Sequence, residues 1–286
     1  MRGSNKENMS QLPTLLEMLK AGVHFGHQKS RWHPKMQPYL FGSRNGVHVI
    51  DLDRTVEQLN KALDYTRSLA AKGKTILFVG TKRQARDIIK DAAEKCGMPF
   101  LTERWIGGLI TNFEECKRRL KKYKTLKEMF VTGEIEKYTK KEQSTFKKQI
   151  EKMDKYLAGL VTLTDIPDAL YIADLRVEKT AVAEANRKDV TMIAVCDSNV
   201  DPTKVDYPIP ANDDAVNAIR LIAELMTEAV NQGKAEFEKN KVAVKDVPMT
   251  HIFTSSEKSE KAAAPKVQAD KTVKKERRAI RKEEVV

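Results

Sequence analysis

The chain has 286 residues, 41% of them hydrophobic, a formal net charge of +12 and a pI of about 9.4. This length and apolar fraction allow one sizeable core with appendages, and the excess positive charge favours a polyanionic partner. No apolar run approaches the ~20 residues that a membrane span needs, and three scattered cysteines without a signal-peptide pattern exclude a disulfide framework, so we expect a cytoplasmic or organelle-matrix protein.

The positive charge is segregated along the chain. Lys and Arg outnumber Asp and Glu by 7 to 2 in residues 1–50, by 11 to 8 in residues 51–111 and by 14 to 8 in residues 112–157. Residues 158–233 reverse the balance with 6 basic against 13 acidic side chains, and residues 234–286 carry 14 against 9. One part of the globular body is therefore acidic, while the charge that suits a polyanion lies elsewhere.

The first predicted elements are short. Residues 1–11 are polar, and we predict a flexible N-terminus there. Pro13 can begin a helix that runs to about Ala21 and ends at Gly22. One face of this helix carries Leu15, Leu16 and Leu19.

The run from His24 to Met36 mixes three histidines with cations and aromatic rings. The histidines have no neighbouring cysteine or carboxylate, and His33-Pro34 favours an extended backbone, so a metal site is a weak interpretation. A basic loop with interleaved aromatic rings is typical of RNA contact, and plain packing is the alternative. The RNA-binding candidates in this loop are His24, His27, Lys29, Arg31, Trp32 and Lys35.

A β-hairpin is predicted next. Residues 39–41 and 47–50 flank the turn sequence Gly42 to Gly46, in which Asn45-Gly46 suits positive φ. Arg44 would lie at the exposed tip and is a further RNA-binding candidate.

A helix and a strand-loop-helix unit follow. Thr55 with Gln58 three residues later is a capping-box pattern, and it predicts a helix that Gly73 stops. Residues 74–79 then predict a buried strand and residues 80–83 a loop. The next helix would turn inward Ala85, Ile88, Ile89, Ala92 and Ala93.

Two nucleotide-site alternatives arise here. Gly73 to Thr75 imitates the end of a P-loop, but it precedes the strand and Ser68 stands where the first glycine belongs, so the match is chance. Gly80 does lie between strand and helix, where backbone N–H groups can hold a phosphate, yet one glycine falls far short of a dinucleotide motif. An RNA phosphate suits the loop equally well, and the candidates there are Lys82 and Arg83.

Residues 112–157 break the α/β alternation. Two lysine-rich helical stripes predict an antiparallel helical hairpin that turns near Gly133, with a first arm of about 28 Å. The bend before it, with Gly107-Gly108 and the possible N-cap Asn112, would root the hairpin on a buried Trp105. Because the seam is narrow, most cations stay in water. The RNA-binding candidates are Arg104, Lys117, Arg118, Lys121 and Lys124.

Alternation resumes in residues 158–233. Strands are predicted at residues 169–173 and 191–195, with a helix at 177–186 between them and an edge-like segment at 207–210. Asn212 would cap the last helix. Strands joined by helices need crossovers, so we predict an α/β fold with a Rossmann-like (flavodoxin-like), mostly parallel sheet covered on both faces. The side chains expected to face inward are Val177, Ala181, Val182, Ala185, Val216, Ile219, Ile222, Ala223, Met226 and Val230.

Five aspartates follow or flank the carboxyl ends of these strands, where α/β enzymes place their chemistry. A metal or an acid/base pair is one interpretation, but no nucleophile lies close in sequence, and helix N-termini and turns explain the residues as well. We therefore predict no catalytic, cofactor-binding or metal-binding residue. Beyond residue 233 the chain is charged with little apolar periodicity, which predicts a disordered tail over residues 234–286. The five aspartates are Asp174, Asp197, Asp201, Asp213 and Asp214.

Several motifs together resemble one family over about residues 12–233. They are Leu19-Lys-Ala-Gly-Val-His-Phe-Gly-His27, Trp32-His-Pro-Lys-Met36, Phe41-Gly-Ser-Arg-Asn-Gly46, Phe78-Val-Gly-Thr-Lys-Arg83, Arg104-Trp-Ile-Gly-Gly108, Leu109-Ile-Thr-Asn112, Pro167-Asp-Ala-Leu170 and Ile209-Pro-Ala-Asn-Asp-Asp214. The sequence resembles the small-subunit ribosomal protein numbered two, in its bacterial or organellar form.

The resemblance implies a structural protein that binds ribosomal RNA and contacts other small-subunit proteins, including in many bacteria the large modular mRNA-binding one. It implies no catalysis, no cofactor, no membrane and no homo-oligomer. A nucleotide-dependent enzyme on a Rossmann-like fold is the alternative, and a free regulatory RNA-binding protein would show the same sequence features. The expected organisation is a first α/β part over residues 12–111, the hairpin insertion over 112–157 and a second α/β part over 158–233.

Overall fold

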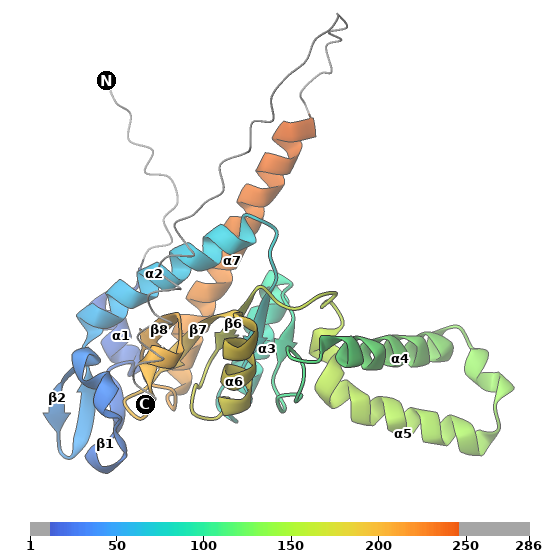
Figure 1. Cartoon of the computed structure of the whole chain (residues 1–286), viewed down its shortest axis with the longest axis horizontal. Coiled ribbons are helices and arrows are strands. Elements are labelled where there is room, and N and C mark those ends of the chain that lie inside the picture. Colours follow the sequence, from blue (N-terminus) through green and yellow to red (C-terminus); the bar gives the residue numbers. More distant parts are fainter. Residues whose placement is uncertain (1–11, 246–286) are drawn as a thin grey trace, which may run out of the picture. The chain divides into compact units, whose positions relative to one another are not determined.

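The computed structural model describes residues 12–245, so the expectations for residues 1–11 and 246–286 lie outside the described residues. A parallel sheet flanked by helices is preceded by a small antiparallel sheet and interrupted by a helical hairpin (Figure 1). None of the helices in this range has the length and apolar character of a membrane span.

The central sheet contains five short strands, all paired in parallel in the order β5-β4-β6-β7-β8. Its first two strands are exchanged and the others follow in chain order, which is the flavodoxin-like arrangement. The predicted α/β class is confirmed, and the proline-containing β8 lies at the edge, where its missing N–H groups are tolerated. The strands are β4 (Ile76–Val79), β5 (Phe100–Leu101), β6 (Ala169–Ile172), β7 (Thr191–Cys196) and β8 (Tyr207–Pro210).

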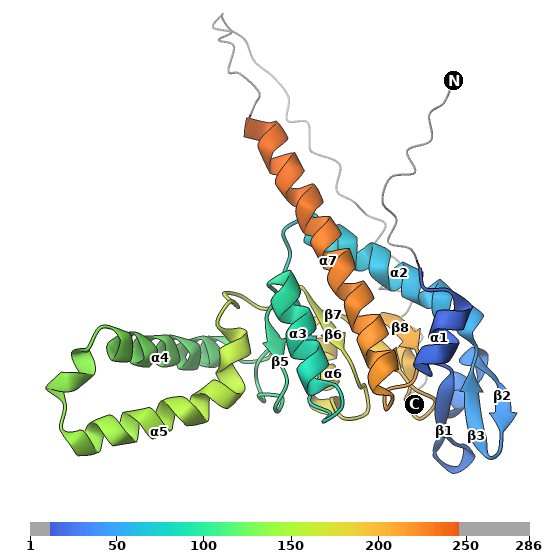
Figure 2. The same cartoon turned by 180° about the vertical axis from the view of Figure 1, so that it is seen from behind.

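Successive side chains of each strand point to opposite faces of the sheet, and helices cover both faces, so both sets of side chains are buried. Ile76, Phe78 and Tyr171 pack beneath α2 (Leu52–Ala70), α3 (Arg86–Cys96) and α7 (Val216–Lys245). On the other face, Leu77 and Ile172 pack against α6 (Lys179–Lys188) and the root of the hairpin. Figure 2 shows α2, α3 and α7 together on one side of the sheet.

Some expected inward faces are wrong. In α1 (Leu15–Ala21), Leu16 is 69% exposed and Met18 is the buried residue, because this short helix reaches the core with one side chain only. Val177 lies in the turn before α6 and Val216 is the first residue of α7, and both are exposed, so the buried stripes begin at Ala181 and Ala218. The remaining expected positions of α6 and α7 are buried.

The N-terminal module is a three-stranded antiparallel sheet of order β1-β3-β2, made by β1 (Phe25–Gln28), β2 (Leu40–Arg44) and β3 (Val47–Ile50). The predicted β-hairpin turn is confirmed, with positive φ at Asn45 and Gly46. The expectation of a loop throughout residues 24–36 is wrong, because Phe25–Gln28 pairs with β3 and short 3-10 turns follow. Local alternation does not reveal this strand, since its partner lies twenty residues further along.

The start of α2 also differs from the prediction. Asp51 is the N-cap and accepts a hydrogen bond from the backbone N–H of Asp53 (3.0 Å). Thr55 is instead buried inside the helix, and its hydroxyl donates to the carbonyl of Pro210 at 2.6 Å. The threonine therefore joins α2 to β8 instead of opening the helix.

The helical hairpin consists of α4 (Phe113–Val131), a 3-10 turn at Glu134–Lys137 and α5 (Lys140–Leu157). Gly133 has φ 75° and makes the predicted turn. Near the root, Leu120 and Tyr123 are buried against α5, and the Tyr123 hydroxyl donates to Asp154. Figures 1 and 2 show both arms leaving the sheet beside β5.

Helix α7 continues past Gly233 to Lys245, twelve residues into the segment expected to be a tail. Gly233 lies where α7 crosses α2, and a Cβ at this position would come within 2.4 Å of the carbonyl of Arg67 and 2.6 Å of the Cβ of Ala70. The glycine permits the close approach of the two helices.

Replacing Gly233 tests this packing. Alanine favours a helix over glycine by about 1 kcal/mol, but overpacking against a backbone carbonyl costs about 1–3 kcal/mol. We expect Gly233→Ala to lower the free energy of unfolding by up to about 2 kcal/mol in urea titrations. The control Gly42→Ala adds a Cβ that meets nothing within 4 Å and should change stability by less than about 0.5 kcal/mol. Equal effects of the two variants would contradict the interpretation.

Candidate functional site

Four of the five aspartates singled out in the sequence converge at the carboxyl edge of the parallel sheet. Asp174 follows β6, Asp197 follows β7, and Asp213 and Asp214 follow β8. Parallel strands end at the same edge, so residues separated by 40 positions meet there. Asp174, Asp197 and Asp213 are no more than 3% exposed, whereas the Asp214 side chain is 55% exposed.

Lys82, from the loop after β4, supplies the positive charge of this cluster. Its Nζ lies 2.7 Å from Asp213, 2.8 Å from Asp214 and 3.1 Å from Asp174. Burial lowers the pKa of Lys82, but the hydrogen bonds to Asp213 and Asp214 outweigh it and hold the pKa above its ordinary value. The ammonium group therefore stays charged and pairs with carboxylates inside the protein.

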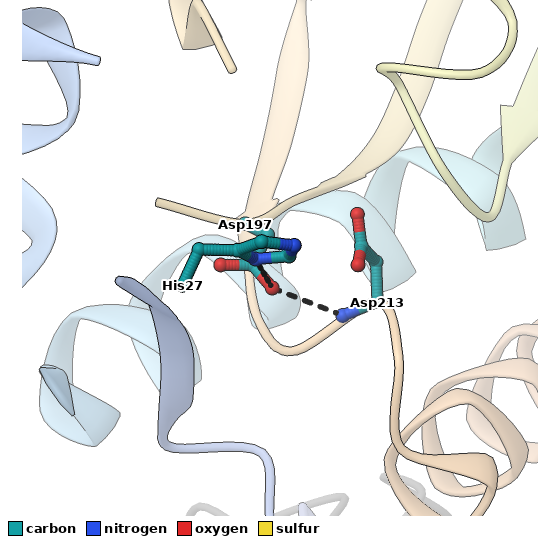
Figure 3. A group of neighbouring side chains, drawn as sticks. All are labelled: His27, Asp197 and Asp213. Atoms are coloured by element: carbon teal, nitrogen blue, oxygen red, sulfur yellow. Dashed lines mark hydrogen bonds and ion pairs between the residues drawn. The ribbon is translucent and has the colours of Figure 1, made fainter. Parts of the chain in front are cut away.

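His27 reaches the same cluster from β1. Its Nδ1 lies 3.0 Å from Asp197 and its Nε2 lies 3.4 Å from Asp214, and Figure 3 shows the ring against the Asp197 carboxylate with Asp213 beside it. The hydrogen bond with Asp197 raises the pKa of His27, although burial opposes it. Its backbone N–H donates to the Ser198 hydroxyl at 2.7 Å.

Glycine precedes His27 for a steric reason. A Cβ on Gly26 would lie 2.9 Å from the Ser198 hydroxyl oxygen, too close for any side chain. The short contact lets β1 lie directly on the loop after β7. The cluster therefore joins the N-terminal module to the parallel sheet.

The acidity of this cluster predicts how stability depends on pH. Burial, together with Asp174 and Asp197, raises the pKa of Asp213 from 3.8 to about 7. A raised folded-state pKa contributes stability that is complete below the unfolded pKa and is lost as the pH rises through the folded pKa. The raised pKa of His27 acts in the same direction above its ordinary value of 6.5. The free energy of unfolding should therefore fall between pH 5 and pH 7, by at most about 1.4 kcal/mol per pH unit for one proton.

Urea unfolding at a series of pH values, with a chelator present, measures this slope. Asp213→Asn should flatten it. Asp201→Asn should not, because the pKa of Asp201 is lowered, so its contribution is lost only below pH 3.8. Stability that rises from pH 5 to pH 7 in the unmodified protein would contradict the expectation.

The donor atoms of this cluster also have the composition of a metal site. His27, Asp197 and Asp213 each offer one ligand atom, all within 4.8 Å of one another. One imidazole nitrogen with two carboxylate oxygens suits a divalent ion such as Zn²⁺. Lys82 provides a competing positive charge at the same carboxylates.

The geometry does not favour the enzyme alternative. Ser198 is fully buried, so it is no accessible nucleophile. In the loop after β4, the backbone N–H of Thr81, which could have met a phosphate, donates instead to the buried carboxylate of Glu178 at 3.1 Å. Gly80 serves packing, since a Cβ there would lie 2.7 Å from Ile89. A side chain of the protein thus occupies the position that a nucleotide phosphate would need.

The structure separates the predicted RNA-binding residues into two groups. His27 and Lys82 belong to the internal cluster, His24 is half-buried, and Lys35 approaches Asp201 at 3.5 Å. Trp32 is 36% exposed, and its ring lies tilted against His48 with ring centroids 5.2 Å apart. The others are exposed, namely Lys29, Arg31, Arg44, Arg83, Arg104, Lys117, Arg118, Lys121 and Lys124.

The sequence patterns did not indicate a role for Glu184 of α6. Its buried carboxylate accepts hydrogen bonds from the indole N–H of Trp105 (3.0 Å) and from the backbone and side chain of Thr111. The burial of Trp105 is confirmed. The sequence does place this glutamate at an inward helical position among alanines and valines. That pattern only weakly indicates a buried carboxylate, because many glutamates at such positions reach solvent.

Comparison with known proteins decides the family. The model for the family described as ribosomal protein S2 matches residues 18–233. The chain belongs to the ribosomal protein S2 family. A relative from Coprothermobacter proteolyticus, the small ribosomal subunit protein uS2, is 47% identical over 221 residues, which cover 77% of this chain and 82% of that protein. As a member of the S2 family the chain is a ribosomal protein and not an enzyme.

The match covers nearly all the described S2 fold. It begins within α1 and ends within α7 at Gly233, where α7 crosses α2. The last twelve residues of α7 lie beyond it.

Proposed function

We propose that this chain is a structural component of the small subunit of cytoplasmic ribosomes, present as a single copy, and that it grips ribosomal RNA with exposed cations. The observation that supports this best is the division of charge. The buried acidic cluster is balanced internally by Lys82 and His27, whereas the cations of the hairpin and the N-terminal module face solvent. Exposed cations can neutralise phosphates and release counterions.

The hairpin presents a basic surface. Residues 112–157 contain 14 basic and 8 acidic side chains, and the apolar seam leaves one side of each arm in water. Lys117, Lys121 and Lys124 recur at spacings of four and three, so they share one face of α4. Such a stripe suits a run of phosphates along an RNA strand.

The N-terminal module adds aromatic rings to cations. Lys29, Arg31 and Arg44 are exposed, and Phe41 has 81% of its surface in solvent. Isolated exposed aromatic rings beside cations suit stacking on unpaired bases. The module therefore supports contact with RNA that is not fully helical.

The surface between α3 and α7 supports contact with proteins. A cavity of about 640 Å³ between α3 and α7 is lined by Asp87, Asp91, Glu224 and Glu228, with Lys95 and Arg220 as its basic residues. Excess carboxylates repel phosphates, so we expect this surface to avoid RNA and to meet solvent or a basic protein. Neighbouring ribosomal proteins, including the large modular mRNA-binding one, are the proposed partners.

Sedimentation of cell lysate tests the proposal most directly. The chain should travel with small subunits and should be released by high salt, because its grip depends on phosphate contacts. Sedimentation with free RNA or as free protein would favour a regulatory RNA-binding protein. Saturable micromolar binding of ATP, GTP or NAD in calorimetry would contradict the purely structural role.

A further inference from the structure

The root of the hairpin is organised around one carboxylate. Glu184 is 8% exposed, and its Oε1 accepts hydrogen bonds from the Trp105 indole (3.0 Å) and the Gly108 backbone (2.8 Å). Its Oε2 accepts from the backbone N–H groups of Ile110 (3.2 Å) and Thr111 (3.1 Å) and from the Thr111 hydroxyl (3.0 Å). Five donors fill both oxygens, and all five belong to residues 105–111, shortly before α4.

These hydrogen bonds stabilise the charged Glu184 carboxylate in the absence of a paired cation among the described residues. Burial raises the pKa of Glu184, but the hydrogen bonds from Trp105, Gly108 and Thr111 outweigh it, so the pKa lies below its ordinary value. No ion pair of Glu184 occurs among residues 12–245. The carboxylate is stabilised by aligned N–H and O–H dipoles, which fix the loop around it.

Apolar packing of Phe113, Cys116 and Leu157 in the core also anchors the root, whereas the hydrogen bonds to Glu184 are directional. Asn112 at the start of α4 makes no capping hydrogen bond with its side chain. Beyond Tyr123 the two arms contact each other, and Lys127 of α4 pairs with Asp154 of α5 at 2.9 Å. The orientation of an arm about 28 Å long is thus set at its root, where a tilt of about 20° would move the tip by roughly 10 Å.

We propose that Glu184 is the positioning residue of the hairpin. By locking residues 105–111, it sets the angle at which α4 and α5 leave the sheet and so aligns the cationic stripe with its RNA. The alignment of the cationic stripe with RNA rests on the proposed function, whereas the angle between the hairpin and the sheet does not depend on it. The Trp105 indole and the Gly108 backbone are two of the donors, so the motif that contains Trp105, Gly107 and Gly108 helps to fix the root of the hairpin.

Pulsed electron paramagnetic resonance measures the angle directly. Nitroxides on Glu136→Cys at the hairpin turn and Asp91→Cys on α3 report the distance between hairpin and body, and both sites are exposed. Selective labelling is possible because the native thiols are buried, namely Cys96, Cys116 and Cys196. The unmodified protein should give one narrow distance distribution.

Glu184→Gln is the informative variant. The amide retains one acceptor but turns an NH₂ group toward backbone donors, so at least two hydrogen bonds are lost. The width of the distance distribution should at least double, and affinity for small-subunit ribosomal RNA should fall roughly tenfold, since misaligned cations lose phosphate contacts. Trp105→Phe removes one donor and should give an intermediate width.

Glu178→Gln is the matched control. Glu178 is also buried, at 2% exposed, and its carboxylate accepts hydrogen bonds from the backbone N–H and the hydroxyl of Thr81 in the loop after β4. This variant should lose thermal stability while the distance distribution stays narrow. If Glu184→Gln does not fold by circular dichroism, Thr111→Val, which removes only the hydroxyl donor, takes its place.

The outcomes separate the inference from the proposed function. A narrow distribution in a folded Glu184 or Thr111 variant overturns the positioning role, even if RNA binding is weakened. A broadened distribution with unchanged RNA affinity keeps the positioning role and contradicts the hairpin as an RNA grip.

Discussion

Removing the ammonium group of Lys82 should lower the free energy of unfolding at pH 7.5 by about 3–5 kcal/mol, the cost of leaving buried charges unpaired. In Lys82→Met the aliphatic stem remains, but Asp174, Asp213 and Asp214 lose their common cation. The deficit should shrink as the pH is lowered to 5, because Asp213, whose pKa burial raises to about 7, is then protonated and needs no cation. Urea unfolding at the two pH values measures both effects.

Lys74→Met is the matched control for this prediction. Lys74 pairs with Asp168 at 2.9 Å, but its side chain is 51% exposed, and such surface pairs contribute about 0–1 kcal/mol. Should Lys82→Met fail to fold, adding Asp213→Asn ought to restore part of the stability by removing one uncompensated charge. Equal losses for Lys82→Met and Lys74→Met would show that the cluster does not depend on its lysine.

Reversing three charges on α4 should have the largest effect on RNA binding. The variant Lys117→Glu, Lys121→Glu and Lys124→Glu replaces exposed cations on one helical face, while the apolar seam is untouched. We expect affinity for small-subunit ribosomal RNA to fall roughly 100-fold at moderate salt, and the slope of log affinity against log salt to decrease by about 2–3 for three lost phosphate contacts. Filter binding over a salt series and incorporation into small subunits measure these quantities.

A second triple variant controls for net charge. Lys72→Glu, Lys95→Glu and Lys188→Glu make the same change after α2, on α3 and on α6, outside the hairpin. This variant should keep most of the RNA affinity and the salt slope. Similar losses in both variants would mean that total charge, and not the hairpin surface, determines binding.

The two electrostatic systems of the protein serve different purposes. Lys82 and the aspartates are enclosed, so their interactions hold β1, the strand-end loops and α7 together. Lys117, Lys121 and Lys124 of α4 are exposed, and their contacts within the protein are weak, as with Lys117 and Asp165 at 3.7 Å. Side chains that are not committed internally remain free to bind phosphates, so residue type alone does not indicate which lysine binds RNA.

The sequence by itself determined the α/β class, the parallel sheet, the hairpin insertion and most of the core. Those features depend on patterns with short periods, such as the buried runs at Ile76–Val79 and Thr191–Cys196 and the helical stripe from Phe113 to Tyr123. A residue four positions away on a helix, or two on a strand, is a guaranteed neighbour, so local order reveals these elements. The motifs also carried the resemblance to the S2 family, which the comparisons confirmed.

Only the tertiary structure decided which charged residues meet. His27 lies 170 positions from Asp197, Lys82 lies 131 positions from Asp213, and Glu184 lies 79 positions from Trp105. Such contacts arise from strand order and crossover direction, which no local period encodes. For the same reason the sequence could not separate an internally paired Lys82 from an exposed Lys121, because their difference is one of position in the fold and not of chemistry.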